Sequence, residues 1–174
     1  MSTLLNRSHF DQIWRIMEPS FPRDERRPRE KQEALFEEPA YRVYGVVDEC
    51  GAVIAFIAAW DLGEVLFIEH FAVDPARRNG GIGSKLLSEV VGETKKTVCL
   101  EVELPECELA RRRIGFYERN GFYYNDYPYV QPALSAGQGT LPLRVMTSGS
   151  AVSYDRFAEI KSLLYKEIYH TLEN

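Results

Sequence analysis

Apolar residues recur every three or four positions in several stretches of the chain, the spacing that keeps side chains on one face of a helix. Phe10, Ile13, Trp14 and Met17 form one such face near the N-terminus. Prolines follow the first two stretches and Gly121 follows a later one, as expected where helices end. The pattern predicts helices over residues 8–18, 29–37, 106–120 and 153–172, and a further helix that opens in the glycine run at 80–83 and continues to about residue 92.

Shorter runs between these helices are rich in β-branched and aromatic residues, as is typical of strands. Asp48–Gly51 separates two of the runs and suits a hairpin turn. Strands are predicted over residues 41–47, 53–60, 64–73, 97–104, 122–130 and 141–147. Because helices and strands interleave, we expect an α/β (α+β) fold. It would have a mixed central sheet of six to seven strands, flanked by helices, and an extra C-terminal helix.

The length of 174 residues suits a single domain over residues 1–174, with the helix at 153–172 as an appendage. Hydrophobic residues make up 45% of the chain and charged residues 27%, which is a globular rather than a disordered composition. The 21 Lys and Arg residues against 26 Asp and Glu give a net charge of −5. We therefore expect no nucleic-acid partner, although a local basic site is compatible with this total.

The cysteines and histidines argue against a metal site. Cys50, Cys99 and Cys107 are odd in number and form no Cys-x-x-Cys pair, which argues against a disulfide framework or a zinc site of known spacing. The three histidines are scattered, so we expect no metal. Residues 1–10 show no secretory signal, and the longest apolar run, 53–60, is too short to span a bilayer. We expect a cytoplasmic protein with no membrane partner.

The strongest chemical signal is a glycine-rich turn between a predicted strand and a predicted helix. Gly80, Gly81 and Gly83 allow the backbone to approach a ligand closely, and the helix start exposes unpaired N–H groups. Nearby Arg77, Arg78 and Lys85 add positive charge. This combination indicates an anion site that suits a pyrophosphate.

Two common phosphate motifs do not fit this turn. A Walker A loop would need Gly-Lys-Ser or Gly-Lys-Thr at its end, whereas the order here is Gly83-Ser84-Lys85. A dinucleotide fingerprint would need a third glycine where Leu86 stands. Both mismatches count against a nucleotide-binding protein.

The run Arg78-Asn79-Gly80-Gly81-Ile82-Gly83, after a strand that ends in Ala72-Val73-Asp74-Pro75, resembles the acyl-coenzyme-A-binding motif of the GNAT (Gcn5-related N-acetyltransferase) superfamily. A plain helix cap with a surface arginine is the alternative for this motif alone. A second block, Phe116 to Phe122, resembles the Phe-Tyr-x-x-x-Gly-Phe segment of the same family. The resemblance covers roughly residues 41–130, and the order of the predicted elements extends it to the strand at 141–147.

The resemblance implies an acyl-CoA N-acyltransferase fold with acetyl-CoA as co-substrate. Ala110 and Arg113 stand where many members have Asn and Ala, so the arginines at 111–113 are either substitute phosphate contacts or a solvated helix face. The residues implied to bind the cofactor are Phe71, Ala72, Val73, Arg78, Asn79, Gly80, Gly81, Ile82, Gly83, Ser84, Arg113 and Phe116.

The resemblance also implies two catalytic residues. Glu69, on the strand before the turn, would be the base that deprotonates the amine, directly or through water; its alternative is a carboxylate that binds a cationic substrate. His70 is a neighbouring choice, but strand alternation should place it on the opposite face. Tyr117 would be the acid that protonates the thiolate, with Phe116 as the core member of that pair; its alternative is a core aromatic.

The implied activity is transfer of acetyl from acetyl-CoA to a primary amine by direct attack in a ternary complex, because no residue has a convincing nucleophile setting. The alternatives are a catalytically silent acyl-CoA sensor and an enzyme with a longer acyl donor. The acceptor would be a small-molecule or peptide amine, and the protein a monomer or homodimer. The residues implied to bind this amine substrate are Phe21, Glu25, Tyr124 and Tyr129.

Overall fold

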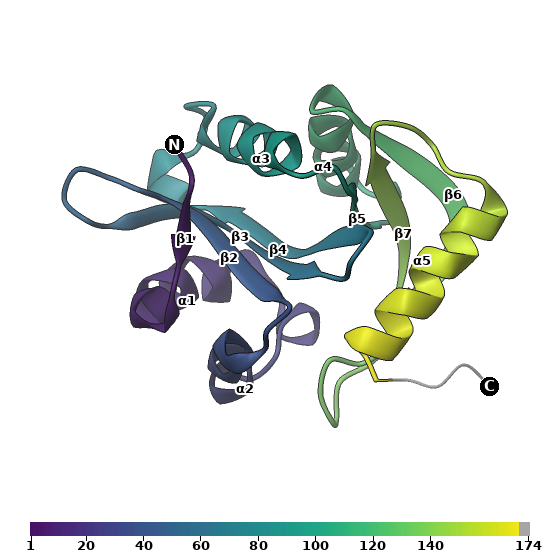
Figure 1. Cartoon of the computed structure of the whole chain (residues 1–174), viewed down its shortest axis with the longest axis horizontal. Helices are drawn as coiled ribbons and strands as arrows, with labels where there is room; N and C mark the ends of the chain where they lie inside the picture. Colours follow the sequence, from purple (N-terminus) through teal and green to yellow (C-terminus); the bar gives the residue numbers. More distant parts are fainter. Residues whose placement is uncertain (171–174) are drawn as a thin grey trace. The chain divides into compact units, whose positions relative to one another are not determined.

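The structure, a computed structural model, describes residues 1–170 and has a mixed α/β fold (Figure 1). Its strands follow the order β1-β2-β3-β4-β5-β7-β6 in one seven-stranded sheet. The chain has two compact units, and each is described separately. The first comprises Met1–Asp61 and Ile68–Lys95, and the second comprises Leu62–Phe67 and the chain from Lys96 onward. That these units form a single domain stays a prediction.

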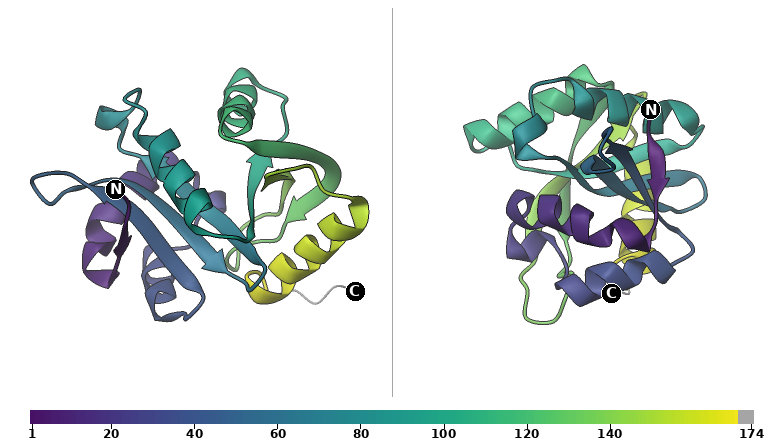
Figure 2. Two further views of the ribbon diagram at one scale, coloured as in Figure 1. Left: turned by 45° about the horizontal axis from the view of Figure 1, so that its top comes forward. Right: turned by 90° about the vertical axis from the view of Figure 1, so that its left-hand side faces the viewer.

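The first unit is a set of strands covered on both faces by helices. Its strands are β1 (Thr3–Leu5), β2 (Tyr41–Val47), β3 (Val53–Asp61) and the end of β4 (Val65–Val73). Figures 1 and 2 show α3 (Ile82–Glu93) on one face and α1 (Phe10–Ser20) and α2 (Arg29–Ala34) on the other. Since both faces are covered, β3 is buried from Val53 to Trp60 and its sequence is almost entirely apolar.

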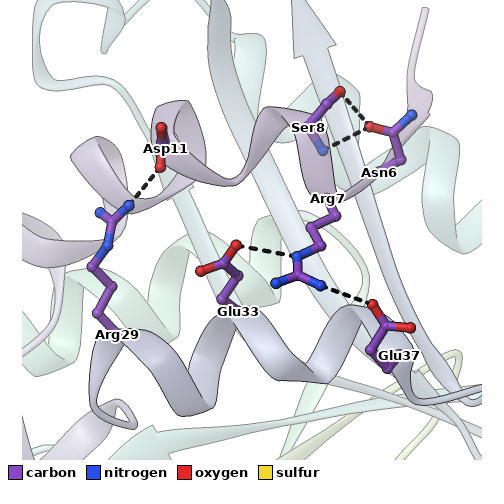
Figure 3. Close-up of polar contacts among 7 residues, drawn as sticks. All are labelled: Asn6, Arg7, Ser8, Asp11, Arg29, Glu33 and Glu37. Atoms are coloured by element: carbon purple, nitrogen blue, oxygen red, sulfur yellow. Dashed lines mark hydrogen bonds and ion pairs between the residues drawn. The ribbon is translucent and has the colours of Figure 1, made fainter.

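Ion pairs fasten α1 and its preceding turn to α2 within this unit (Figure 3). Arg7 reaches Glu33 and Glu37, each at 3.1 Å, and Arg29 at the start of α2 pairs with Asp11 of α1. These pairs are largely exposed, so each contributes at most about 1 kcal/mol. Their effect is to connect the start of α1 and the turn before it to α2 and to the short helical turn that follows α2.

The second unit has antiparallel strands between two helices. β7 (Leu141–Ser148) pairs with both β5 (Thr97–Glu103) and β6 (Phe122–Gln131). Figure 2 shows α4 (Glu108–Arg119) and α5 (Tyr154–Glu167) on opposite sides of these strands. On β6, the Phe122 ring meets Tyr117 of α4, whereas the Tyr129 ring meets Phe157 of α5. Between these two contacts, the pairing of β6 with β7 shifts register between Asn125 and Tyr129. The side chains of β6 therefore do not alternate regularly between the two faces of the strands.

The predicted strands agree with the structure, whereas several predicted helix bounds shift. Residues 7–9 and 35–37 form short 3-10 helices, so α2 ends at Ala34 rather than at residue 37, and α4 begins at Glu108 rather than at residue 106. Every predicted strand is present with its bounds shifted by at most one residue, but β1 is an additional strand that the hydrophobic pattern did not indicate. The first helix continues through Pro19 to Ser20. The last helix ends at Glu167, and positions 171–172 of its predicted range lie outside the described residues. In residues 1–170 no helix combines the length and apolar character needed to cross a membrane.

Candidate active site

The turn between β4 and α3 carries the glycine-rich motif and belongs to the first unit. After β4 ends at Val73, the Asp74 carboxylate accepts a hydrogen bond from the Ala76 amide at 2.9 Å. Gly81, the N-cap of α3, has a left-handed backbone with φ of 73°, which glycine adopts without strain. A Cβ there would meet no heavy atom within 4 Å, so the backbone conformation, not lack of space, requires glycine.

The start of α3 offers backbone donors to a ligand. Gly81 has no side chain with which to cap the helix, and the amides of Ile82, Gly83 and Ser84 have no carbonyl of their own helix to pair with. The helix dipole adds positive potential at the same end. This geometry can bind a pyrophosphate.

Two arginines on the turn have different partners. The Arg78 side chain is exposed, and its Nε donates to the Val73 carbonyl at 3.2 Å, so it folds back toward the end of β4. Arg77 pairs with Asp48 of the β2–β3 turn at 3.3 Å. Arg78 is therefore the better placed of the two to add its charge to the turn. The cofactor residues that the sequence predicts in the first unit lie along this stretch. Phe71, Ala72 and Val73 end β4; Arg78, Asn79, Gly80 and Gly81 precede α3; and Ile82, Gly83 and Ser84 form its first turn.

Glu69 lies in a buried ion pair with a residue of the segment between α1 and α2. Nη1 of Arg27 donates to Oε1 of Glu69 at 2.7 Å, and the two side chains are only 8% and 4% exposed. The Arg27 guanidinium also lies over the Trp60 ring, 6.0 Å from its centroid. The Glu69 carboxylate is thus already paired within the first unit.

His70 contacts the other oxygen of the same carboxylate. Its Nδ1 lies 3.4 Å from Oε2 of Glu69, and its Nε2 lies 2.8 Å from the Glu25 carbonyl. Because a carbonyl only accepts, Nε2 carries the proton of that bond. The prediction that strand alternation separates Glu69 from His70 is wrong, since both side chains turn toward the segment between α1 and α2.

The surroundings hold Glu69 as a carboxylate. Burial by itself would raise the pKa of its carboxyl group, but the charge of Arg27, helped by His70, outweighs burial and lowers that pKa to about 2. Such a weakly basic carboxylate cannot efficiently take a proton from an alkylammonium group directly. Because Nε2–H of His70 donates to the Glu25 carbonyl, Nδ1 is the ring nitrogen that faces the carboxylate.

Several polar atoms around Glu69 are buried without a partner. Among residues 1–170, Oε2 of Glu69, Nδ1 of His70, Oε1 of Gln32 and Nε1 of Trp60 are buried with no hydrogen-bond partner. Direct contacts link their residues: Nε2 of Gln32 donates to the Tyr41 hydroxyl at 3.1 Å, and the Tyr41 ring lies 5.2 Å from that of Trp60. Burial, and then the charge of Glu69, raises the pKa of Tyr41. This group of side chains therefore contains both hydrogen-bond donors and hydrogen-bond acceptors that could still bind a partner.

Two of the residues predicted to bind the amine substrate lie beside this group. The Phe21 ring, at the end of α1, meets the His70 ring edge-on with 4.8 Å between centroids. Glu25 approaches through its backbone carbonyl, as described above. Tyr124 and Tyr129 belong to β6 of the second unit: Tyr124 is half-buried, whereas Tyr129 is buried and its hydroxyl donates to Glu101.

Tyr117 lies on α4 in the second unit. It is 9% exposed, and its ring contacts those of Phe116 at 5.3 Å and Phe122 at 5.8 Å. Burial raises the pKa of its hydroxyl to about 12, although Arg113 acts to lower it. The phenol therefore keeps its proton at neutral pH and can donate it. The expectation that Phe116 is the core member of the pair is wrong, because Phe116 is half-buried and Tyr117 is buried.

Arg113, also on α4, pairs with Glu103 of β5. Nη1 of Arg113 donates to Oε2 of Glu103 at 2.8 Å, and both side chains are about two-fifths exposed (39% and 40%). An exposed pair of this kind is weak and is readily exchanged for another anion. Arg111 instead donates to the Pro105 carbonyl at 3.0 Å and so braces the start of α4.

The sequence did not indicate the partners of Glu69. Arg27 is one of four arginines between positions 23 and 29, and no spacing distinguishes it from Arg23, Arg26 or Arg29. Gln32, Tyr41 and Trp60 occupy ordinary helix and strand positions. Only the packing of the segment between α1 and α2 against β4 brings these side chains together.

The comparisons with known proteins identify the family. A profile of the acetyltransferase (GNAT) family matches residues 10–122. A search of curated proteins finds no match. A structure described as a GNAT-family acetyltransferase from Bacteroides thetaiotaomicron is 30% identical, covers 99% of both chains and superposes with a TM-score of 0.90.

More distant structures share the fold. A spermidine N-acetyltransferase SpeG mutant from Vibrio cholerae is 14% identical over 85% of this chain and 94% of its own, with a TM-score of 0.64. The ribosomal-protein-S18-alanine N-acetyltransferase of Escherichia coli is 18% identical over 88% of this chain and 96% of its own, with a TM-score of 0.64. The fold and the glycine turn thus define an acetyltransferase-type protein, and the chain belongs to the GNAT family.

Proposed function

We propose that this protein transfers the acetyl group of acetyl-CoA to a primary amine within a ternary complex. The observation that carries the proposal is the uncapped start of α3 behind the left-handed Gly81, in a chain of the GNAT family. A helix start with free amides favours a pyrophosphate, which coenzyme A carries. The proposed cofactor residues are those of the turn and of the end of β4, together with Arg113 and Phe116.

In the proposed reaction the neutral amine nitrogen attacks the thioester carbonyl carbon. A C–N bond forms, the C–S bond breaks, and the thiolate takes a proton from the Tyr117 hydroxyl. The amine's surplus proton passes toward Glu69, through water or through His70, because the lowered pKa of Glu69 makes direct transfer unfavourable. The proton on Tyr117 is then restored from solvent.

The acceptor is proposed to be a small-molecule or peptide amine. Structures that share the fold include a spermidine N-acetyltransferase and a ribosomal-protein alanine N-acetyltransferase, so both substrate classes occur on this scaffold. A test panel should therefore pair polyamines with amino acids, aminoglycosides and short peptides that have free N-termini.

A catalytically silent acyl-CoA sensor is the second candidate, because Arg27 already offsets the charge of the carboxylate that would receive the amine's proton. Calorimetric titration with acetyl-CoA, ATP and NAD tests cofactor binding, and release of free thiol in the presence of the panel tests turnover. The proposed enzyme binds acetyl-CoA selectively and releases thiol with at least one amine. Binding without thiol release from any amine would favour the sensor, and selective binding of ATP or NAD would contradict both candidates.

A further inference from the structure

We infer that Arg27 is a positioning residue for the part of the site that receives the amine's proton. It holds the Glu69 side chain as a carboxylate in one orientation, so that Oε2 of Glu69 and Nδ1 of His70 together face the incoming proton. The inference rests on the proposed acetyl transfer. It assigns a role to a residue outside both family motifs, which cover β4 to α3 and α4 to β6.

Arg27 determines the orientation of the Glu69 carboxylate. Oε1 of Glu69 accepts from Nη1 of Arg27 at 2.7 Å, which leaves Oε2 directed at Nδ1 of His70, 3.4 Å away. Both atoms are buried, and within the described residues neither has a hydrogen-bond partner apart from this mutual contact. A proton placed on either atom would therefore be held between them.

A second contact holds His70 in the matching orientation. Its Nε2 donates to the Glu25 carbonyl at 2.8 Å, and the Phe21 ring packs edge-on against the imidazole. With Nε2 occupied as a donor, Nδ1 is the ring nitrogen that faces Glu69. The segment between α1 and α2 therefore fixes both members of the pair, one through the side chain of Arg27 and the other through its backbone.

The neighbouring Arg29 offers a matched control for Arg27. It lies two residues away, just after the segment, and pairs with Asp11 of α1 (Figure 3), with the two side chains 46% and 82% exposed. An exposed pair of this kind contributes little to stability, so its loss should leave Arg27 in place.

A double-mutant cycle separates positioning from simple stabilisation. We expect R27M to lower kcat about tenfold or more, with little change in KM for acetyl-CoA, and R29M to leave both nearly unchanged. In the E69Q background, R27M should cause almost no further loss of kcat, because Arg27 acts through Glu69. R27K, which keeps the charge but not the planar guanidinium, should restore part of the activity. The R27M/E69Q protein leaves no unpaired buried charge, so it stays measurable even where R27M folds poorly.

The pH dependence of kcat/KM provides a second test, because the loss of a purely structural contact would not change it. The charged and titratable groups facing Glu69 are Arg27, His70 of β4 and Tyr41 of β2. Without Arg27 the buried carboxyl ionises at higher pH, so R27M should shift the acid limb of kcat/KM upward, and R27M/E69Q should lack that shift.

Each outcome decides the inference. A wild-type protein that turns over no amine overturns the proposed function and this inference with it. Turnover in the wild type with R27M equal to R29M overturns the inference alone. An equal loss from R27M with and without Glu69, or an unchanged acid limb, would show that Arg27 is only a structural fastener.

Discussion

The Tyr169 hydroxyl donates to both oxygens of the Glu101 carboxylate, at 2.9 and 3.0 Å, across 68 residues of sequence. Tyr129 of β6 donates to Oε1 of the same carboxylate. Tyr169 follows α5 and Glu101 lies on β5, so the contact ties the residues after the last helix to the middle of the second unit's strands. These hydroxyl groups donate hydrogen bonds that replace the water lost by the partly buried Glu101 carboxylate.

This contact makes a stability prediction. Tyr169→Phe removes a hydroxyl that donates to a charged group, so we expect the free energy of unfolding to fall by about 1 to 2 kcal/mol. Tyr154→Phe is the control, because Tyr154 on α5 is 62% exposed, and its effect should stay within about 0.5 kcal/mol. Urea unfolding of the three proteins measures both. Equal stability of Tyr169→Phe and the wild type would show that the contact contributes nothing.

Glu69 should make the protein sensitive to acid. Its pKa falls to about 2 in the folded state, from an ordinary value of 4.5, so the unfolded state binds the proton more readily. The stabilisation is therefore present above the ordinary pKa and is lost as the pH falls toward 2, by an amount on the order of 3 kcal/mol. Denaturant unfolding between about pH 6 and 3 should show a fall with acid that is smaller in Glu69→Gln. An identical acid dependence in the two proteins would contradict the ion pair with Arg27.

Two glycines at opposite ends of α3 should respond oppositely to alanine. Gly81 has φ of 73°, which costs a non-glycine residue about 1 kcal/mol, and its distortion should weaken acetyl-CoA binding about fivefold. Gly92 lies within the helix, and a Cβ on it would meet no heavy atom within 4 Å. Gly92→Ala should therefore add about 0.5 to 1 kcal/mol of stability and leave binding unchanged. Thermal unfolding measures the stability of the two variants, and calorimetry measures their affinity for acetyl-CoA. Equal affinity in the two variants would show that the conformation of the turn does not matter for cofactor binding.

Tyr117 should act as a proton donor over the whole neutral and mildly alkaline range. Burial raises its pKa to about 12, so it should cause no alkaline loss of kcat below about pH 11. Tyr117→Phe should lower kcat about tenfold or more without weakening acetyl-CoA binding. The exposed Tyr123 of β6 supplies the control variant Tyr123→Phe, which should behave like wild type. An unchanged kcat in Tyr117→Phe would leave Tyr117 with only its packing role.

Hydrophobic periodicity predicted the strands well because most of them contribute directly to a covered sheet. β3 shows this most clearly, since its continuous apolar run is what burial on both faces requires. β1 could not be recognised, because three residues are too few to show a period and Leu4 is 61% exposed. Pro19 also gave a wrong helix end: the helix continues past it by one residue, to Ser20.

The positions of the motif residues followed from sequence, but their partners did not. The glycine turn could be placed because its constraint is local: a left-handed residue at a helix start. The Arg27–Glu69 pair joins residues 42 positions apart and depends on how a loop packs, which no local pattern encodes. The same holds for Tyr117, whose ring packs against Phe122 of the following strand.

Release of coenzyme A thiol tests the central claim most directly. Purified protein is incubated with acetyl-CoA and each amine of the panel, and free thiol is followed together with the mass of the amine. The account predicts that at least one amine is acetylated with one thiol released per acetyl group, and that Glu69→Gln slows this about a hundredfold while still binding acetyl-CoA. Tight binding of acetyl-CoA with no acetylated amine and no thiol above the protein-free rate would contradict it.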